Sequence, residues 1–314
     1  MEVKLFRDFV PNDLNRVLYW SPLEIYMNCP QQYLWRYGWH TIDLGMGLGK
    51  PKAAPLLESR ENSIMGTVIQ YAIEKMYNDK MYLDPQDLLP KLYAIANQHL
   101  IKQISRQYVD WSKSPSKEEM RLTIEEGIKG YLRTMSRNKL LGEYAQCEVD
   151  LNAWVTPEIA VGGKADLIIH RQGKILIFDG KNSQSRGKYT NPDQLRWYGF
   201  VHYLMHGTIP DYLAFIYYRY PAGTLEDGKE LTGLDEVLFV KDDIPRLSDM
   251  VLQSRKGMAT DQWQATPVPK NCQFCIYETV CDERQTQRQA NAAKRTKKTP
   301  ELVPGGVMDI SFGD

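Results

Sequence analysis

Residues 162–181 have the sequence GGKADLIIHRQGKILIFDGK, and this stretch decides the fold. Apolar residues follow Asp166 at 167–169, and a second apolar run at 175–178 ends at Asp179. Both runs are typical of buried strands, and the polar stretch between them predicts a short turn. Adjacent antiparallel strands joined in this way bring Asp166 and Asp179 within reach of one divalent cation. Two carboxylates and a main-chain carbonyl, here that of Gly180, form a hard oxygen site that suits Mg²⁺ or Mn²⁺.

The flanking segments predict an α/β core with a mixed sheet. We expect strands at 146–155, 158–169, 174–179, 212–219 and near 236–240, and helices at 193–206 and from about 244 to 256. Residues 63–141 have mostly helical spacing of apolar residues, with breaks near 84–85 and 114–115. Further upstream, Ser21-Pro22 is typical of a helix start, and Pro30 interrupts that helix just after Cys29.

Lys181 lies two positions after Asp179, so its side chain leaves the same face of the strand. An ammonium group there orients a nucleophile and offsets charge on a phosphate, and a buried lysine with a lowered pKa acts as a base. The structural alternative is that Asp-x-Lys occurs by chance and that an Asp at a strand end is a turn residue. The context favours the catalytic interpretation, because Gln194 and Tyr198 follow on one helical face.

Three short motifs therefore occur in a fixed order: Gly-x-x-Asp at 163–166, Asp-Gly-Lys at 179–181 and Gln-x-x-x-Tyr at 194–198. This pattern resembles motifs II and III and the terminal motif of RecB-type PD-(D/E)XK nucleases. The resemblance implies a restriction-endonuclease-like core, in which helices flank a mixed sheet. It implies catalytic roles, or DNA contacts and support of the site, for five side chains: Asp166, Asp179, Lys181, Gln194 and Tyr198.

The helix that precedes these strands departs from the family. It usually carries Gly-x-x-x-His, whose imidazole binds the metal, whereas residues 66–70 here end in Gln70. A carboxamide oxygen is a hard neutral ligand that favours Mg²⁺, so Gln70 is a candidate metal ligand. The same departure also predicts weaker metal binding and reduced activity. Glu74 and Glu148 either add carboxylates to the site or are ordinary surface charges, and both alternatives stay open.

The sequence has five cysteines, and a tight cluster near the C-terminus favours metal ligation over disulfides. A fourth thiolate must come from Cys29 or Cys147, and a free cysteine such as Cys147 is unremarkable in a buried strand. The arrangement resembles AddB-type and CRISPR-adaptation nucleases, in which one early and three late cysteines hold a [4Fe–4S] cluster. Spacing alone does not separate such a cluster from a four-cysteine zinc site, and the resemblance favours iron–sulfur. The ligands it implies are Cys29, Cys272, Cys275 and Cys281.

Basic and aromatic residues near these motifs are candidate DNA contacts. Arginine and lysine position phosphates, and aromatic rings stack on bases. For each residue alone, a surface charge or a core aromatic is the alternative interpretation, and nothing in the sequence offers base-specific readout. The candidates are Arg186 and Lys188, with Arg36, Arg196 and Trp197 as further members of the groove.

The composition suits one large domain, or a domain with a helical insertion. The 314 residues are 43% hydrophobic, and 39 basic residues balance 39 acidic ones, so only a local groove would attract nucleic acid. No apolar run has the length of a membrane span and no signal-peptide core is present, so we expect a cytoplasmic protein, or one of the host cytoplasm for a virus. The expected parts are an N-terminal segment with the first cluster cysteine (1–62), a helical region (63–141), the nuclease core (142–260), the Fe–S motif (261–283) and a basic, disordered tail (284–314).

These observations predict a metal-dependent deoxyribonuclease that acts as an exonuclease on single strands or duplex ends, in recombination, repair or phage DNA processing. The alternative that Gln70 motivates is a DNA-binding or scaffold protein that keeps the fold and has lost turnover. A third alternative is a zinc adaptor without nuclease ancestry. The tail either only solubilises the chain, or its basic stretch grips DNA, or its apolar end docks on a replication or recombination protein.

Overall fold

The computed structural model describes residues 17–37, 60–112, 115–142, 144–187, 190–260, 262–273 and 275–296. Within these ranges, no helix combines the length and apolar character that crossing a bilayer requires.

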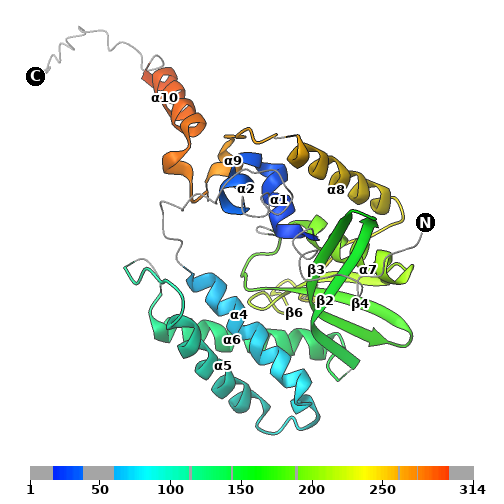
Figure 1. Cartoon of the computed structure of the whole chain (residues 1–314). Coiled ribbons are helices and arrows are strands. Elements are labelled where there is room, and N and C mark those ends of the chain that lie inside the picture. Colours follow the sequence, from blue (N-terminus) through cyan, green and yellow to red (C-terminus); the bar gives the residue numbers. More distant parts are fainter. Residues whose placement is uncertain are drawn as a thin grey trace, which may run out of the picture.

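A mixed sheet forms the centre of the molecule (Figure 1). The strand order is β1-β3-β4-β5-β8, and β2 pairs with the other edge of β3. β1 is parallel to β3 and β4 is parallel to β5, whereas the remaining pairs are antiparallel. The predicted mixed sheet is therefore confirmed. Among the described residues its strands are β1 (Val17–Tyr19), β2 (Tyr144–Thr156), β3 (Ile159–Arg171), β4 (Lys174–Lys181), β5 (Tyr212–Tyr217) and β8 (Leu234–Glu236).

Helices cover both faces of this sheet and create two hydrophobic cores. One core joins the sheet to α4 (Glu61–Asn78), α5 (Leu88–Ile104) and α6 (Lys117–Arg137). The other joins it to α1 (Trp20–Asn28), α7 (Pro192–His206) and α8 (Asp243–Ala259). Figure 1 shows α4, α5 and α6 packed together away from α1 and α8. The helical region predicted at 63–141 thus shares a core with the mixed sheet.

Strand β4 shows why this sheet has continuous apolar runs in its sequence. Leu176 and Phe178 pack into the core under α4 to α6, whereas Ile175 and Ile177 pack into the core under α7. A strand buried on both faces has no polar alternation, and this is the pattern at 175–178.

Local signals set the ends of the helices that matter for the site. Ser116 and Glu119 form a reciprocal capping box at the start of α6. Asn191 caps α7 by accepting a hydrogen bond from the main-chain N–H of Asp193, and Pro192 occupies the first turn. Gly207 ends α7 with a φ of 71°, a left-handed conformation that glycine adopts without strain.

The remaining described elements are short or peripheral. They are α2 (Pro30–Tyr37), η3 (Met81–Leu83), the hairpin of β6 (Gly223–Thr224) and β7 (Glu230–Leu231), α9 (Pro269–Cys272), η4 (Glu278–Val280) and α10 (Asp282–Thr296).

The sequence predicted β2, β3, β4, α7 and α8 within a few residues, and it predicted the break between α1 and α2 at Cys29. It missed β1, and it placed β8 slightly too late, because the buried residues Val237 and Phe239 follow that strand without belonging to it. Residues 284–296, expected in a disordered tail, form most of α10, while 297–314 lie outside the described residues.

Candidate active site

A gap between two strands positions the first acidic residue. β1 and β4 pair with the same edge of β3, since β2 occupies the other edge. Along β3, pairing with β1 ends at Gly162 and pairing with β4 starts at Leu167. Residues 163–166 therefore lie between these two partners. Within this gap, the Oδ2 atom of Asp166 accepts a hydrogen bond from the main-chain N–H of Gly180 at 2.8 Å. The split edge of β3 therefore holds the Asp166 carboxylate against the end of β4.

Asp179 belongs to a compact polar group between β4 and α7. Its Oδ2 atom lies 2.5 Å from Nζ of Lys181, and its Oδ1 atom accepts a hydrogen bond from Nε2 of Gln194 at 2.9 Å. Lys181 in turn donates to Oε1 of Gln194 at 2.9 Å, and the Tyr198 hydroxyl is 3.5 Å from Asp179 Oδ1. The structure thus brings together Asp179, Lys181, Gln194 and Tyr198, the residues that strand and helix spacing selected.

The two carboxylates interact electrostatically but have different neighbours. Asp166 lines a cavity beside α4, whereas Asp179 is hydrogen-bonded to Gln194 of α7. Burial raises the pKa of both carboxyl groups, and the charge of Asp179 raises the pKa of Asp166 further. Lys181 acts in the opposite direction on each.

This arrangement has the chemistry of a cation site without being a closed one. Across the described part of the chain, no three His, Cys, Asp or Glu side chains are already grouped to hold a metal ion. The donor set nevertheless fits a hard divalent cation, because two buried carboxylates in mutual electrostatic contact are stabilised by added positive charge. Gln194 and Tyr198 of α7 contact only Oδ1 of Asp179, whereas its buried Oδ2 makes no hydrogen bond with the described residues and lies 2.5 Å from Nζ of Lys181. That the two carboxylates share one cation stays a prediction.

Gln70 on α4 supports Asp166 through its main chain. Its Nε2 donates to the carbonyl oxygen of Asp166 at 3.0 Å, and its Oε1 accepts from the Tyr218 hydroxyl at 2.7 Å. Tyr218 reaches this position only because residue 180 is glycine, since a Cβ there would lie 1.7 Å from the hydroxyl oxygen. The structure gives Gln70 a positioning role, and metal ligation by Gln70 and by the Gly180 carbonyl stays a prediction.

A cavity of about 750 Å³, open to solvent, adjoins Asp166 on the α4 side. Glu74 and Glu148 both line it, so the two acidic residues that sequence left ambiguous lie at the site. Glu148 has a φ of 54°, a strained conformation for a side chain-bearing residue, and it pairs with Lys164 at 3.0 Å. His99 on α5 was not predicted, since only the packing of α5 against α4 brings it to this cavity.

The predicted DNA contacts divide into different fates. Arg186 forms an ion pair with Asp235 at 2.8 Å and is half exposed. Trp197 is buried in the core, where its Nε1 donates to the Gly162 carbonyl at 2.9 Å, so the core alternative holds for this residue. Lys188 lies outside the described residues.

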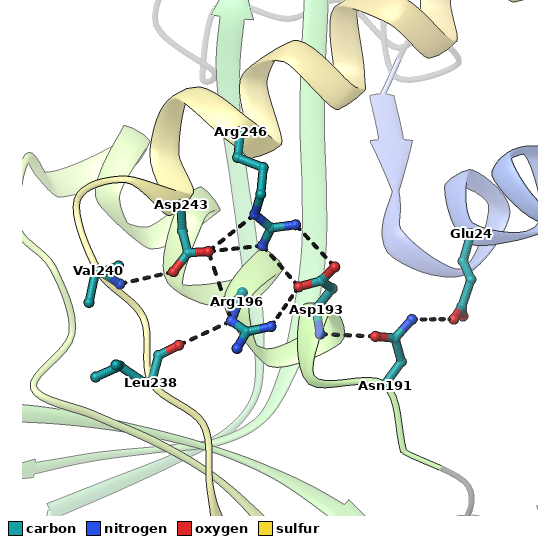
Figure 2. A network of polar contacts seen from close by, with 8 residues as sticks. All are labelled: Glu24, Asn191, Asp193, Arg196, Leu238, Val240, Asp243 and Arg246. Atoms are coloured by element: carbon teal, nitrogen blue, oxygen red, sulfur yellow. Dashed lines mark hydrogen bonds and ion pairs between the residues drawn. The ribbon is translucent and has the colours of Figure 1, made fainter.

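Arg196 belongs to a network that fixes the first turn of α7 (Figure 2). Asp193 accepts hydrogen bonds from Arg196 at 2.8 Å and from Arg246 of α8 at 2.9 Å. Asn191 extends the network to α1 by donating to Glu24 at 2.7 Å. Because Gln194 lies in this same turn, the network positions the partner of Asp179 and Lys181.

The four cysteines expected at one site do line one cavity. It has about 350 Å³ of space, part of it open to solvent, and Cys29, Cys272, Cys275 and Cys281 all face it. Cys29 lies between α1 and α2, and Asn271 donates to the carbonyl of Asn28 at 2.5 Å, so two segments far apart in the sequence meet here.

The chemistry of these thiols fits a metal centre. Burial raises the pKa of Cys272, Cys275 and Cys281, and the charge of Cys29 adds to this effect in each. Cys147 is separate, since it packs against the core under α4 to α6, where burial raises its pKa to about 12. A cation bound in this cavity would stabilise the thiolate form of the thiols that line it.

Comparison with known proteins agrees with this geometry. The profile described as PD-(D/E)XK nuclease superfamily matches residues 20–282. No curated protein matches the chain. A solved structure titled "Crystal structure of SSO0001" is 15% identical, with a TM-score of 0.32, and the alignment covers 70% of this chain and 85% of that one. That likeness is too low to carry an argument, whereas the matched range of residues 20–282 covers most of the described chain, from α1 to the start of α10. The chain belongs to the PD-(D/E)XK nuclease superfamily.

Proposed function

We propose that the protein is a Mg²⁺- or Mn²⁺-dependent nuclease that hydrolyses DNA phosphodiesters. The observation that carries the proposal is the group of Asp179, Lys181 and Gln194 beside Asp166 at the split edge of β3. Superfamily membership supports hydrolysis, and the clustered carboxylates support a hard divalent cation.

Each side chain has a role that follows from its contacts. Asp166 and Asp179 would hold the cation, which supplies a Lewis acid that offsets negative charge on the reacting phosphate. Lys181 has its Nζ at the exposed edge of this group, where it donates to a phosphate oxygen or orients the attacking water. Gln194 is hydrogen-bonded to both Asp179 and Lys181, so it fixes the position of the ammonium group relative to the carboxylate.

We further propose that the substrate is a single strand or a duplex end and that degradation is exonucleolytic, in recombination, repair or phage DNA processing. The support is the resemblance to RecB-type nucleases at the three motifs. A cytoplasmic location, docking of a replication or recombination protein on the C-terminal tail, and phosphate contacts from Arg186 and Lys188 belong to the same proposal.

The test uses end-labelled single- and double-stranded DNA with Mg²⁺, Mn²⁺ or EDTA. We expect cleavage with either metal and none in EDTA. Lys181→Met removes the charge at similar volume and is expected to lower kcat by ~100-fold or more. Lys174→Met is the matched control, because Lys174 lies exposed at the opposite end of β4, and it should retain full activity. Full activity of Lys181→Met would refute the assignment.

We propose that the cysteine cavity holds a [4Fe–4S] cluster, with Cys29, Cys272, Cys275 and Cys281 as its ligands. Four thiols around one cavity suit either iron–sulfur or zinc, but a single Zn²⁺ draws four sulfurs to about 2.3 Å. The four thiols line one cavity, and the choice of iron–sulfur over zinc rests on the resemblance to iron–sulfur nucleases. The group would tie α1 and α2 to residues 266–281 and close the chain around the nuclease core.

Anaerobic purification with iron and zinc analysis tests this assignment. Cys29→Ser should lose iron and the brown colour, whereas Cys147→Ser should keep both, since Cys147 is elsewhere. A colourless protein that contains stoichiometric zinc would show that the four cysteines hold zinc and not an iron–sulfur cluster.

A second function, a DNA-binding scaffold with little turnover, has one observation in its favour. The Oε1 atom of Gln70, in place of the family's imidazole, is already engaged by Tyr218. This function predicts DNA binding without cleavage under any metal, and a gain of cleavage in Gln70→His.

A further inference from the structure

A second cavity, separate from the one beside Asp166, adjoins Lys181. It has about 1080 Å³ of space, open to solvent, and its walls include Lys181, Asn182, Ser183, Thr190 and Arg219. No aspartate or glutamate is among the described residues that line it. The cavity beside Asp166, in contrast, is lined by three carboxylates. The cavity beside Asp166, which Gly180 lines, is therefore acidic and attracts cations. The second cavity, which Lys181 and Asn182 line, has basic residues and attracts anions.

Two polar side chains in this cavity have no partner within the described protein. Both amide atoms of Asn182 are buried and make no hydrogen bond with the residues that the structure describes. The buried Nε of Arg219 is likewise unbonded, and no ion pair joins its guanidinium to a described acidic residue. The nearby carboxylates are occupied, since Asp179 contacts Lys181, and Asp235 contacts Arg186 and Tyr217.

Such groups are costly in a folded protein unless a ligand completes them. A buried amide or guanidinium without a partner loses its hydration and gains nothing in exchange. Both residues line the same cavity, and the N–H of Tyr218 donates to the carbonyl of Lys181 at 3.0 Å, so the chain segments that carry them run next to each other. Convergence next to Lys181 indicates a binding function for both.

We propose that Arg219 and Asn182 bind a phosphate group of the nucleic-acid strand, next to the phosphate that is cleaved. This inference rests on the proposed nuclease function and adds a subsite to it. The planar guanidinium and the amide NH₂ both donate to phosphate oxygens. The amide oxygen of Asn182 remains to accept from a sugar or base of the same nucleotide. A free anion would use the first two donors and leave this acceptor without a partner.

The test measures binding of labelled single-stranded oligonucleotides in EDTA, where no turnover occurs. Arg219→Gln should weaken binding about tenfold, which is the effect of one charge-assisted contact. It should also lower the slope of log K against log salt by about 0.7, the value for one phosphate on a single strand. Arg219→Lys keeps the charge and should recover part of both losses. Arg133→Gln, an exposed arginine on α6 outside this cavity, is the matched control and should bind as wild type. Asn182→Ala should weaken binding without changing the salt slope, because it removes no charge.

The phosphate is identified with modified strands. If it is terminal, wild type prefers a phosphorylated end over a hydroxyl end and Arg219→Gln does not. If it is internal, one neutral methylphosphonate weakens wild type and leaves Arg219→Gln unchanged. Wild-type affinity and salt slope in both Arg219→Gln and Asn182→Ala would overturn the subsite, even with normal cleavage. If the wild type does not cleave DNA with any metal while Arg219→Gln still weakens binding, the nuclease function is refuted and the subsite stands.

Discussion

Substitution of Gly180 by alanine tests how the site is held together. A Cβ at this position would lie 1.7 Å from the hydroxyl oxygen of Tyr218 and 2.4 Å from its Cζ. Tyr218 is buried at 3% exposure, and its hydroxyl is bonded to Gln70, so the rigid ring has little room to retreat. Alanine at 180 must therefore displace Tyr218 and break the bond that orients Gln70.

The expected cost has two parts. Overpacking of a filled core costs about 1–3 kcal/mol. Loss of the part-buried hydrogen bond between Tyr218 and Gln70 costs roughly 0.5–1.5 kcal/mol. Since the ring shift relieves part of the clash, we expect Gly180→Ala to lower the free energy of unfolding by about 2–4 kcal/mol in total.

The assay compares Gly180→Ala with two further variants by thermal or denaturant unfolding of the same preparation. Gly66→Ala is the matched control, because its Cβ meets only Asn182 Cβ at 3.9 Å inside α4. It should be neutral or stabilising by up to about 1 kcal/mol, the usual effect of alanine for glycine in a helix. Tyr218→Phe removes the same hydrogen bond as Gly180→Ala, so the double variant should cost less than the sum of the two single ones.

The reasoning is refuted if Gly180→Ala unfolds like wild type. Strict additivity with Tyr218→Phe would also contradict it, because the two changes would then act through separate contacts.

Three other substitutions test the polar parts of the structure. Asp166→Asn should stabilise the protein in EDTA at neutral pH: burial and Asp179 raise the pKa of Asp166, so its contribution to stability is present below the usual aspartate pKa of about 3.9 and is lost as pH rises through the folded value. The free energy of unfolding should vary less with pH in Asp166→Asn than in the wild type, and equal slopes in the two proteins would contradict this. For Asp193, burial alone would raise the pKa, but hydrogen bonds from Arg246 and Arg196 lower it, so its stability is present above about pH 3.9 and is lost as pH falls. Asp193→Asn should therefore lose stability at neutral pH and little in acid, and an unchanged neutral stability would dismiss the network as a support of α7. Ser116→Ala should cost about 1 kcal/mol through loss of the α6 cap, without a change in kcat.

Site residues and strands could be predicted from the sequence where neighbouring residues alone determine them. Asp179, Lys181, Gln194 and Tyr198 could be selected because spacing of two along a strand and four along a helix fixes which side chains share a face. The strands around them could be predicted because burial on both faces removes polar residues from their sequences.

The parts that escaped prediction depend on contacts between distant segments. β1 has three residues, and only its pairing with β3 makes it a strand. His99 and Arg219 carry no local signal, because their cavities form only when α5 packs on α4 and when β5 pairs with β4. α10 was missed for another reason: its Ala, Gln and Arg residues favour a helix, but the lack of large apolar residues suggested disorder.

The position of the lysine between two cavities explains why this edge of the sheet suits phosphodiester chemistry. Hydrolysis needs acidic oxygens for a cation and donors for the phosphate anion, and these opposite charges neutralise one another in ion pairs when they are mixed. The strand end separates them, with Asp166 on one side of Gly180 and Arg219 beyond Lys181 on the other. Under the proposed function, a strand of nucleic acid that spans both cavities would have one phosphate at Lys181 and the next at Arg219. The split edge of β3 would then set both the direction in which the substrate crosses the sheet and the place where it is cut.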